Sequence, residues 1–434
     1  MPQDPYTVAV DFGSHSIKVA VAKQVDDANE QSKTQILSLV EVESGGIKRG
    51  VITNMNDATE ALLRALTQTE NVIGLPIRHA VFGINGTGIS FIHSQGLVIN
   101  TRTDGEIHDS DIERLVEDAR KKAFGINDSE ILHIIPKNYR IDNQIGIRNP
   151  IGMIGRRLES NVMMVSIETS YLRNFTKVVD QAGVEIGGQI FTPLASGDFL
   201  LSHSQKKSGT ILIDIGYSST SYIVWENEEI FATGVIPIGS EHITQDLAVG
   251  LQTTIEMAEE IKCHHINFSA EEGDRAGIST IEMHNPDIGE NERFDMQEAK
   301  LYARSRVEEI FYYINKELKK LGKMSKLAGG AVLIGGGSAL KGIVEVAKDV
   351  LKIPVFKYRF DSSKIEFVPD YNGDPSFMNA ISLVAYFLRQ DDETSPATKT
   401  KSGGIGGFMK SLQGDKKKGG GKMGEMLRRI LPWS

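Results

Sequence analysis

Apolar positions follow two different periods along the chain, which predicts a mixed α/β protein. Short apolar, β-branched runs between polar turns predict strands, and apolar residues every three or four positions predict amphipathic helices. The predicted strands are 8–10, 17–21, 79–84, 131–135, 210–213, 221–224 and 331–334. The predicted helices are 56–66, 109–122, 171–183, 296–321, 340–351 and 376–388. Residues 266–298 are acidic and contain glycine, so loops or short strands are expected there.

One strand, turn and strand unit occurs twice, about 200 residues apart in the numbering. In the first copy the opening strand leads into Asp11 and Gly13, followed by hydroxyl side chains and a second apolar strand. In the second copy Asp214 and Gly216 hold the same places. This internal repeat predicts two similar α/β halves, each presenting an Asp-x-Gly hairpin.

Two such hairpins facing each other across a cleft would suit a nucleotide. Their glycines let backbone N–H groups approach phosphate oxygens, and nearby serine hydroxyls add donors. Asp11 and Asp214 would repel bare phosphate, so they are expected to hold Mg²⁺, mostly through water. A single Asp-x-Gly turn is common in proteins, and the prediction rests on the pair.

A third glycine-rich turn, residues 335–338, lies between a predicted buried strand and a predicted helix. Backbone amides at the start of a helix suit a phosphate or nucleotide. The spacing matches neither the dinucleotide-binding fingerprint nor the P-loop. The alternative is a tight strand-to-helix turn with no ligand.

Composition narrows the classes of protein. The 434 residues are 40% hydrophobic and 24% charged, which is an ordinary globular profile with room for two to four domains. A net charge of −9 argues against a dedicated nucleic-acid binder. The single cysteine, Cys263, excludes an internal disulfide and fits a reducing compartment. The adjacent His264 and His265 make a poor zinc site, because neighbouring helix positions do not face one point. With neither a signal peptide nor a long apolar span in view, a soluble cytoplasmic protein is expected.

Positive charge is concentrated toward the C-terminal end of the sequence. Residues 401–434 carry a net charge of +6 and the rest of the chain −15. Residues 391–421 are polar and rich in glycine and lysine, which predicts a flexible linker. Residues 422–434 have amphipathic spacing and are predicted to fold as a helix on anionic lipid, or alternatively to dock on the protein's own body. The residues expected at the membrane are Met423, Met426, Leu427, Arg428, Arg429, Ile430, Leu431 and Trp433. Residues 405–412 have weaker spacing of the same kind, interrupted by glycines, and are predicted as an auxiliary membrane contact.

With these motifs together, the chain resembles the FtsA family, the bacterial actin-like cell-division proteins of the actin, sugar-kinase and heat-shock-chaperone ATPase superfamily. The resemblance runs over nearly all of residues 6–390. Its most specific part is 132–139 with 146–153 and 155–159, which resembles the inserted subdomain 1C of that family. Residues 236–239 and 243–248 also resemble FtsA.

The resemblance implies an actin-like two-lobed ATPase fold with an FtsA-type 1C insertion, a flexible linker and a C-terminal amphipathic helix. The implied subdomains are 1A (1–82, 164–205 and 376–390), 1C (83–163), 2A (206–241 and 326–375) and 2B (242–325), followed by the linker (391–421) and the membrane-targeting helix (422–434).

The resemblance also implies a nucleotide site for ATP and Mg²⁺. The implied contact residues are Asp11, Gly13, Ser14, His15, Ser16, Lys18, Asp214, Gly216, Tyr217, Ser218, Ser219, Glu259, Lys262, Gly335, Gly336, Gly337 and Ser338. Glu259 and Lys262 would hold the ribose and base, and their three-residue spacing places them on one helix face. A surface ion pair is the alternative for these two. Residues 192–196 resemble the helix that joins the two halves.

Two departures from the superfamily pattern predict slow hydrolysis. Tyr217 and Ser218 replace two glycines of the second hairpin, and a Cβ there restricts backbone approach and positive φ. Thr192 stands where the superfamily often has a Glu or Gln that orients water. At most a weak ATPase is therefore expected, with ATP acting mainly as a structural and assembly ligand.

The function implied is a protein that polymerises on the cytoplasmic face of the cell membrane at the division site. It would anchor FtsZ filaments through the FtsZ C-terminal peptide and recruit later division proteins through 1C. Arg306 and Glu309 lie in a segment resembling the FtsZ-binding region, although a solvated charged face is an equal alternative. One rival is a PilM-like adaptor of type IV pilus assembly, because 13–18 resembles the opening loop of PilM. The other is a metabolite kinase, for which no acidic base with distinctive context is found.

Overall fold

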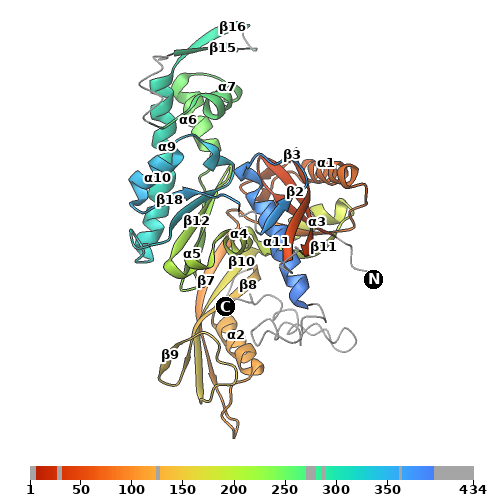
Figure 1. The fold of residues 1–434 in the computed structure, drawn as a ribbon, viewed down its shortest axis with the longest axis vertical. Helices are drawn as coiled ribbons and strands as arrows, with labels where there is room; N and C mark the ends of the chain where they lie inside the picture. The colour runs from red at the N-terminus through yellow and green to blue at the C-terminus, as the bar shows by residue number, and fades with distance from the viewer. Residues whose placement is uncertain are drawn as a thin grey trace.

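Two β-sheets, each built around one copy of the repeated hairpin, form the two lobes of the molecule (Figure 1). The computed structural model describes residues 6–26, 32–123, 128–269, 280–285, 289–360 and 364–394. A third sheet belongs to a domain that is inserted into the first lobe. This inserted domain lies at the bottom of Figure 1.

The first lobe holds a six-stranded sheet with the order β11-β6-β1-β2-β3-β19. β1 runs antiparallel to β2 and parallel to β6. Two helix pairs pack on this sheet, α1 with α3 and α4 with α11. The bounds are β1 (Thr7–Phe12), β2 (Ser16–Asp26), β3 (Ser32–Glu43), β6 (His79–Ile84), β11 (Glu185–Phe191), β19 (Ile365–Phe367), α1 (Met55–Ile73), α3 (Thr169–Gln181), α4 (Thr192–Leu200) and α11 (Met378–Thr394).

The second lobe repeats this arrangement in a five-stranded sheet with the order β14-β13-β12-β17-β18. β12 runs antiparallel to β13 and parallel to β17, as β1 does to β2 and β6. The register also repeats, with Asp11 opposite Lys18 and Asp214 opposite Ser221. The predicted internal repeat is therefore confirmed. The bounds are β12 (Thr210–Ile215), β13 (Thr220–Glu226), β14 (Glu229–Ile236), β17 (Gly330–Ile334) and β18 (Val355–Lys357).

Helix α4 joins the lobes and is almost wholly buried. Side chains of β12 alternate between two cores, as expected for a strand covered on both faces. Ile211 belongs to the core of the second lobe, whereas Leu212 belongs with α4 to the core of the first. The helix lies so close to β13 that a Cβ on Gly197 would sit 2.6 Å from Nε1 of Trp225.

The inserted domain is a four-stranded sheet with the order β7-β10-β8-β9 and one helix packed on it. Part of it, with α2, forms a hydrophobic core of its own. Other buried side chains of its strands belong to the core of the first lobe: Ile89, Leu132, Ile135, Met163, Val165 and Ile167. The sequence predicted the helix and part of β8, but not the long strands β7 and β10. The bounds are β7 (Ile89–Ile99), α2 (Asp109–Ala123), β8 (Ser129–Ile141), β9 (Gln144–Ile147) and β10 (Arg157–Glu168).

The second lobe extends upward in Figure 1 through the long helix α9 to a two-stranded sheet, β15 with β16. These are short strands of the kind expected within 266–298. The remaining bounds are β4 (Ile47–Lys48), β5 (Val51–Ile52), α5 (His203–Ser208), α6 (Glu241–Leu251), α7 (Ile255–Glu260), a π-helical turn (Ile261–His265), β15 (Thr280–Asn285), β16 (Glu290–Asp295), α9 (Met296–Lys320), a 3-10 turn (Gly336–Ala339), α10 (Ile343–Leu351) and a 3-10 turn (Pro375–Phe377).

Several helix ends differ from the prediction. α1 continues to Ile73, seven residues past the predicted end, and stops at Gly74, which is left-handed at φ 71°. α10 begins only at Ile343, because Gly342 has φ 76°. α11 continues to Thr394, four residues into the predicted linker.

The rest of the linker and the predicted amphipathic helix lie outside the described residues, as does the auxiliary pattern 405–412. Among the helices that the structure describes, none combines the length and apolar character needed to cross a membrane.

Candidate nucleotide-binding site

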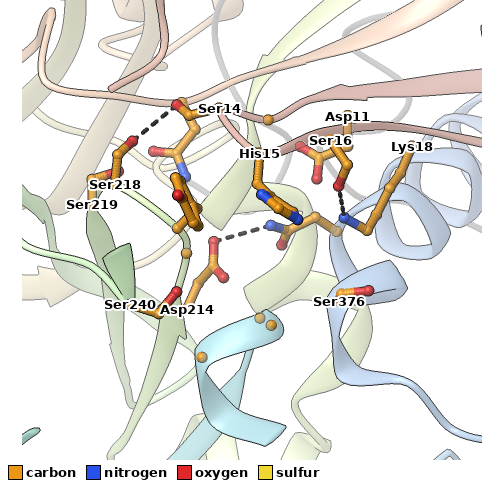
Figure 2. Close-up of a pocket in the computed structure, with 18 of the residues that line it drawn as sticks. Asp11, Ser14, His15, Ser16, Lys18, Asp214, Ser218, Ser219, Ser240 and Ser376 are labelled. Atoms are coloured by element: carbon orange, nitrogen blue, oxygen red, sulfur yellow. Dashed lines mark hydrogen bonds between the residues drawn. The ribbon is translucent and has the colours of Figure 1, made fainter. Parts of the chain in front are cut away.

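A cavity of about 300 Å³ lies between the two hairpins and the glycine-rich turn after β17 (Figure 2). It is lined by segments that are far apart in the sequence. All the predicted nucleotide-contacting residues line it except Ser338. The Ser338 side chain is fully buried and donates a hydrogen bond to the Gly335 carbonyl at 2.7 Å, so its role is to close the turn.

The two predicted metal-site carboxylates come from equivalent positions in the two hairpins. Burial raises the pKa of Asp11 to about 7; Lys18 opposes this shift, and the charge on Asp214 adds to it. Burial also raises the pKa of Asp214, against hydrogen bonds from Asn379 (3.0 Å) and Ser221 (3.3 Å). The raised pKa values show that two neighbouring negative charges are unfavourable here. A divalent cation beside them would stabilise the ionised form of both carboxylates. The residues present therefore fit Mg²⁺.

Lys18 supplies positive charge at the first hairpin. It is buried, donates a hydrogen bond to Ser16, and forms an ion pair with Glu41 at 2.9 Å. Burial works against ionisation of Glu41, but the charge on Lys18 and the hydrogen bonds from Ser16 and Lys18 outweigh it and lower the pKa of Glu41. Glu41 is thus an ionised partner for Lys18 at the edge of the cavity.

The second hairpin forms its turn without strain at the two positions that replace glycines. The Gly216 N–H donates to the Ser219 carbonyl at 3.0 Å. Neither Tyr217 nor Ser218 has positive φ. The turn therefore needs no left-handed residue at either position. The predicted effect of the two side chains on phosphate approach and hydrolysis stays a prediction.

The two hairpins contact each other directly. Ser218 Oγ donates to Ser14 Oγ at 2.9 Å (dashed in Figure 2), and the His15 and Tyr217 rings lie 4.7 Å apart between centroids. The predicted placement of the hairpins across one cleft is confirmed.

Glu259 and Lys262 lie where α7 passes into the π-helical turn, and both line the cavity. They form an ion pair at 2.6 Å, and Thr244 is hydrogen-bonded to both. Lys262 is only 4% exposed. Burial disfavours ionisation of Glu259, yet Lys262 outweighs it and lowers the pKa of Glu259. The pair faces the cavity, so the alternative of a surface ion pair is wrong.

The glycine-rich turn packs directly under Asp214. Gly335 has φ 82°, and a Cβ on it would lie 2.2 Å from Asp214 Oδ1. A Cβ on Gly337 would lie 2.4 Å from Ile215 Cγ2, whereas one on Gly336 would meet only Ser376 Cβ at 3.7 Å. Glycine is required at 335 by conformation and by close approach, but not at 336.

Thr192 does not reach the cavity. Its side chain is fully buried, and within the part of the chain that the structure describes its hydroxyl has no hydrogen-bond partner. It is therefore not placed to orient a water molecule in the cavity.

Several lining residues were missed by sequence reasoning, among them Glu41, Asn85, Ser240, Ser376 and Asn379. They sit on strands, turns and helix starts with no local motif. Asn379 could have been noticed as a polar residue in the first turn of a predicted core helix.

Arg306 and Glu309, the predicted partner residues, do not line the nucleotide cavity. Arg306 on α9 pairs with Asp246 on α6 at 2.7 Å and with Glu309. The side chain of Arg306 is one-quarter exposed, so this cluster lies at the surface of the α6–α9 contact.

Comparison with known families shows which family the chain belongs to. The family model described as "Cell division protein FtsA" matches residues 211–382, and the model "SHS2 domain inserted in FTSA" matches 86–166. The cell division protein FtsA of Bacillus subtilis (strain 168) is 33% identical over 386 residues, covering 88% of this chain and 83% of that protein. The chain belongs to the FtsA family. Members of this family are described as cell-division proteins.

Solved structures of similar fold agree on the architecture. The PilM–PilN type IV pilus biogenesis complex matches with a TM-score of 0.63 at 14% identity, covering 89% of this chain and 99% of that chain. MreB5 of Spiroplasma citri bound to ADP matches with a TM-score of 0.53 at 10% identity, covering 90% and 98%. The predicted actin-like fold with its FtsA-type insertion is confirmed. The likeness to PilM shows the fold alone, whereas sequence identity places this chain with FtsA.

Proposed function

We propose that this FtsA-family chain binds Mg²⁺·ATP in the cavity between its lobes and uses it as an assembly ligand in cell division. The observation that carries the proposal is the convergence of both Asp-x-Gly hairpins and the glycine-rich turn on one cavity. Ser376 adds support: it lines the cavity, and its buried hydroxyl has no hydrogen-bond partner among the described residues. A ligand hydrogen bond would satisfy it.

Most of the predicted lining residues have a proposed role. Asp11 and Asp214 hold Mg²⁺ through water, and the metal neutralises phosphate charge. The backbone amides of the two hairpins, with the Ser14 hydroxyl, hold the phosphates. Further contacts along the hairpins are proposed for Gly13, His15, Ser16, Lys18, Gly216, Tyr217, Ser218 and Ser219. Glu259, Lys262, Gly336 and Gly337 hold the nucleoside.

Hydrolysis is proposed to be weak at most. Glu41 and Glu259 are each paired with a lysine, and Thr192 is buried away from the cavity. A general base needs to reach the attacking water, and these groups are either engaged or remote. ATP therefore acts mainly on conformation and assembly.

Membrane and partner binding complete the proposal. The chain polymerises on the cytoplasmic face of the membrane at the division site, held by residues 422–434 on anionic lipid. Subdomain 2B, with Arg306 and Glu309, binds the FtsZ C-terminal peptide, and the inserted domain recruits later division proteins. Family membership and the +6 charge of residues 401–434 support this.

The test is co-sedimentation with anionic liposomes, with and without Mg²⁺·ATP, comparing the full chain with a truncation after Gly421. The full chain alone is expected to pellet, and electron microscopy of those liposomes should show filaments. Neutral liposomes and the variant Arg428→Glu/Arg429→Glu serve as controls. Equal pelleting of the full chain and the truncation would overturn the membrane part of the proposal.

A PilM-like adaptor role is the second candidate, favoured by the fold match with the PilM–PilN complex. Such an adaptor would not be expected to need residues 422–434 or to bind an FtsZ peptide. Binding of the FtsZ C-terminal peptide to the truncated chain would therefore decide against it.

A further inference from the structure

The inserted domain contacts the second lobe as well as the first, into which it is built. Its strands β8 and β10 contribute side chains such as Ile135 and Val165 to the first core, which anchors the domain to the first lobe. Elsewhere β7 and β8 contact β14, the edge strand of the second lobe. The inserted domain is therefore a second connection between the lobes, besides α4.

Two basic side chains of the inserted domain bind backbone carbonyls of the second lobe. Lys137 on β8 donates to the Phe231 carbonyl, and its Nζ lies 5.9 Å from the centroid of the Phe231 ring. Arg148, just after β9, donates to the Asn227 carbonyl at 2.8 Å and pairs with Glu228 at 3.3 Å. The three partners all belong to the hairpin formed by β13 and β14. We refer to Lys137, Arg148, Asn227, Glu228 and Phe231 as the interdomain contact.

Both strands are irregular at the point where Lys137 meets Phe231. The register of β14 against β13 shifts at Phe231, which is left unpaired as a bulge. The register of β8 against β10 shifts at Asn138, next to Lys137, and Asn138 has φ 42°. Ser160 on β10 donates to the Lys137 carbonyl at 2.9 Å and holds the strand there. A bulge leaves its extra residue outside the ladder and redirects side chains, so the two bulges present the lysine amine and the carbonyl to each other.

The surroundings of the interdomain contact are those of a joint that can separate. A cavity of about 720 Å³ lies between the two domains, and its walls carry polar side chains of both, among them His93, Asn161 and Glu226. A permanent interface is closely packed and apolar, whereas polar interfaces between domains permit relative motion. The docking of the inserted domain on the second lobe thus depends on a few polar bonds.

We propose that the interdomain contact is a releasable restraint on the cleft between the lobes. The inserted domain is anchored in one lobe and held on the other by polar bonds, so a rotation that separates the lobes must break these bonds. A ligand that pulls the inserted domain away from β14 would loosen the cleft in turn. None of the five residues lines the nucleotide cavity, so the restraint acts at a distance from it.

The restraint is tested in the full chain by the distance between two spin labels. In a Cys263→Ser background, Lys121→Cys on α2 and Phe356→Cys on β18 place exposed labels on the inserted domain and on the second lobe. Lys137→Met with Arg148→Gln removes both polar contacts and keeps most of the side-chain volume. The distribution of distances, measured by double electron–electron resonance, should become about twofold broader, because domains joined by few contacts move relative to each other.

Other variants separate the contact from a general loss of charge. Arg140→Gln is the matched control, because Arg140 lies on the same strand as Lys137 but bonds Asp142 and Glu159 within the inserted domain. It should leave the distribution unchanged. Arg148→Glu should broaden the distribution, and Arg148→Glu with Glu228→Arg should largely restore it, since the ion pair forms again with its charges exchanged.

A second readout rests on the proposed nucleotide site. Release of a fluorescent ADP analogue, measured in the chain with its natural cysteine, should be about fivefold faster in Lys137→Met/Arg148→Gln, because opening the cleft no longer breaks two polar contacts. Arg140→Gln should leave the release rate unchanged.

The outcomes for the restraint and for the nucleotide site are separable. An unchanged distance distribution in Lys137→Met/Arg148→Gln, equal broadening in Arg140→Gln, or no recovery on exchanging the charges would overturn the proposal. Broadening with an unchanged release rate would overturn the link between the contact and the cleft. Failure of the unsubstituted chain to bind the ADP analogue would overturn the nucleotide site, while the spin-label distances decide the docking of the inserted domain by themselves.

Discussion

Asp11 is the residue whose electrostatics depend most on the fold. On the strand pattern it is only the first polar residue after an apolar run. In the folded lobe it is partly buried, lines the cavity with Asp214, and has a pKa raised to about 7. A carboxyl with such a pKa carries a proton over part of the physiological range. Cation binding must therefore displace that proton.

Mg²⁺-dependent nucleotide binding should strengthen as the pH rises from 6 to 8, by up to about tenfold per pH unit below 7 and then level off. Titration calorimetry in buffers of different ionisation enthalpy should detect proton release at pH 6.5. In Asp11→Asn both the Mg²⁺ dependence and the proton release should be lost. Proton release that persists in Asp11→Asn would contradict this assignment.

The same carboxyl should affect the stability of the ligand-free protein. Its folded-state pKa lies above the ordinary value of 3.8, so its contribution to folding stability is present below about pH 4 and is lost as the pH rises through 7. At pH 8 Asp11→Asn should raise the free energy of unfolding by about 1–2 kcal/mol, since a buried charge is removed. Urea unfolding measures this. Asp370→Asn, which removes an exposed carboxylate without an ion pair to the described residues, should change little.

At the scale of elements, the turn after β17 combines a conformational and a steric requirement. The strand lies parallel beside β12, and the chain must then turn sharply under Asp214 before the 3-10 turn starts at Gly336. Gly335 meets this need with positive φ and no side chain. Two adjacent glycines therefore have different tolerances.

Gly335→Ala should lower the free energy of unfolding by about 2 kcal/mol or more and abolish nucleotide binding, because its Cβ would collide with Asp214. Gly336→Ala is the matched control, with φ outside the left-handed region and only an ordinary 3.7 Å contact between its Cβ and Ser376 Cβ. It should lower stability by less than about 1 kcal/mol. Thermal unfolding and titration with a fluorescent nucleotide measure both effects. Equal losses in the two variants would show that backbone strain at 335 is not the cause.

The contact between α6 and α9 carries the proposed FtsZ site. Arg306→Ala should weaken binding of a fluorescent FtsZ C-terminal peptide by about tenfold, measured by anisotropy, because a charged group at the proposed interface is lost. Stability should fall by less than about 1 kcal/mol, since these ion pairs are partly exposed. Arg304→Ala on the same helix removes ion pairs to Glu308 and Asp349 and is the control. Equal loss of peptide binding in both would indicate a general effect of helix charge.

At the scale of the whole molecule, the described residues form three hydrophobic cores. The first core includes α4, side chains from both large sheets and part of β8 and β10, whereas the core around α2 in the inserted domain is separate. Lobe geometry at the cleft thus depends on α4, and the core around α2 can be perturbed separately.

Leu115→Ala in the inserted domain and Leu194→Ala in α4 both remove fully buried side chains. Each should cost about 2–5 kcal/mol locally. In Leu115→Ala, hydrogen exchange should show the loss of stability confined to the inserted domain, and nucleotide affinity should change by less than about twofold. Leu194→Ala should weaken nucleotide binding as well. Loss of nucleotide binding in Leu115→Ala would contradict the independence of the two cores.

The sequence by itself determined the α/β class, the two repeated hairpins and the glycine-rich turn, whereas Glu259 and Lys262 were assigned to the site through the resemblance to FtsA. These features are local: strand period, turn chemistry and the glycine requirement are set by a few consecutive residues. Residues 395–434 were assigned from spacing and charge alone, and that assignment stays a prediction.

Only the tertiary structure decided which other side chains reach the cavity and how the hairpins meet. Glu41 and Asn379 line it, Thr192 is buried away from it, and the Tyr217 ring lies against His15. Strands β7 and β10 were not predicted either. Both mix polar and apolar residues, and whether such a segment forms a strand depends on what packs against each of its faces. Burial and contact between lobes depend on which distant elements pack together, and no local period encodes that.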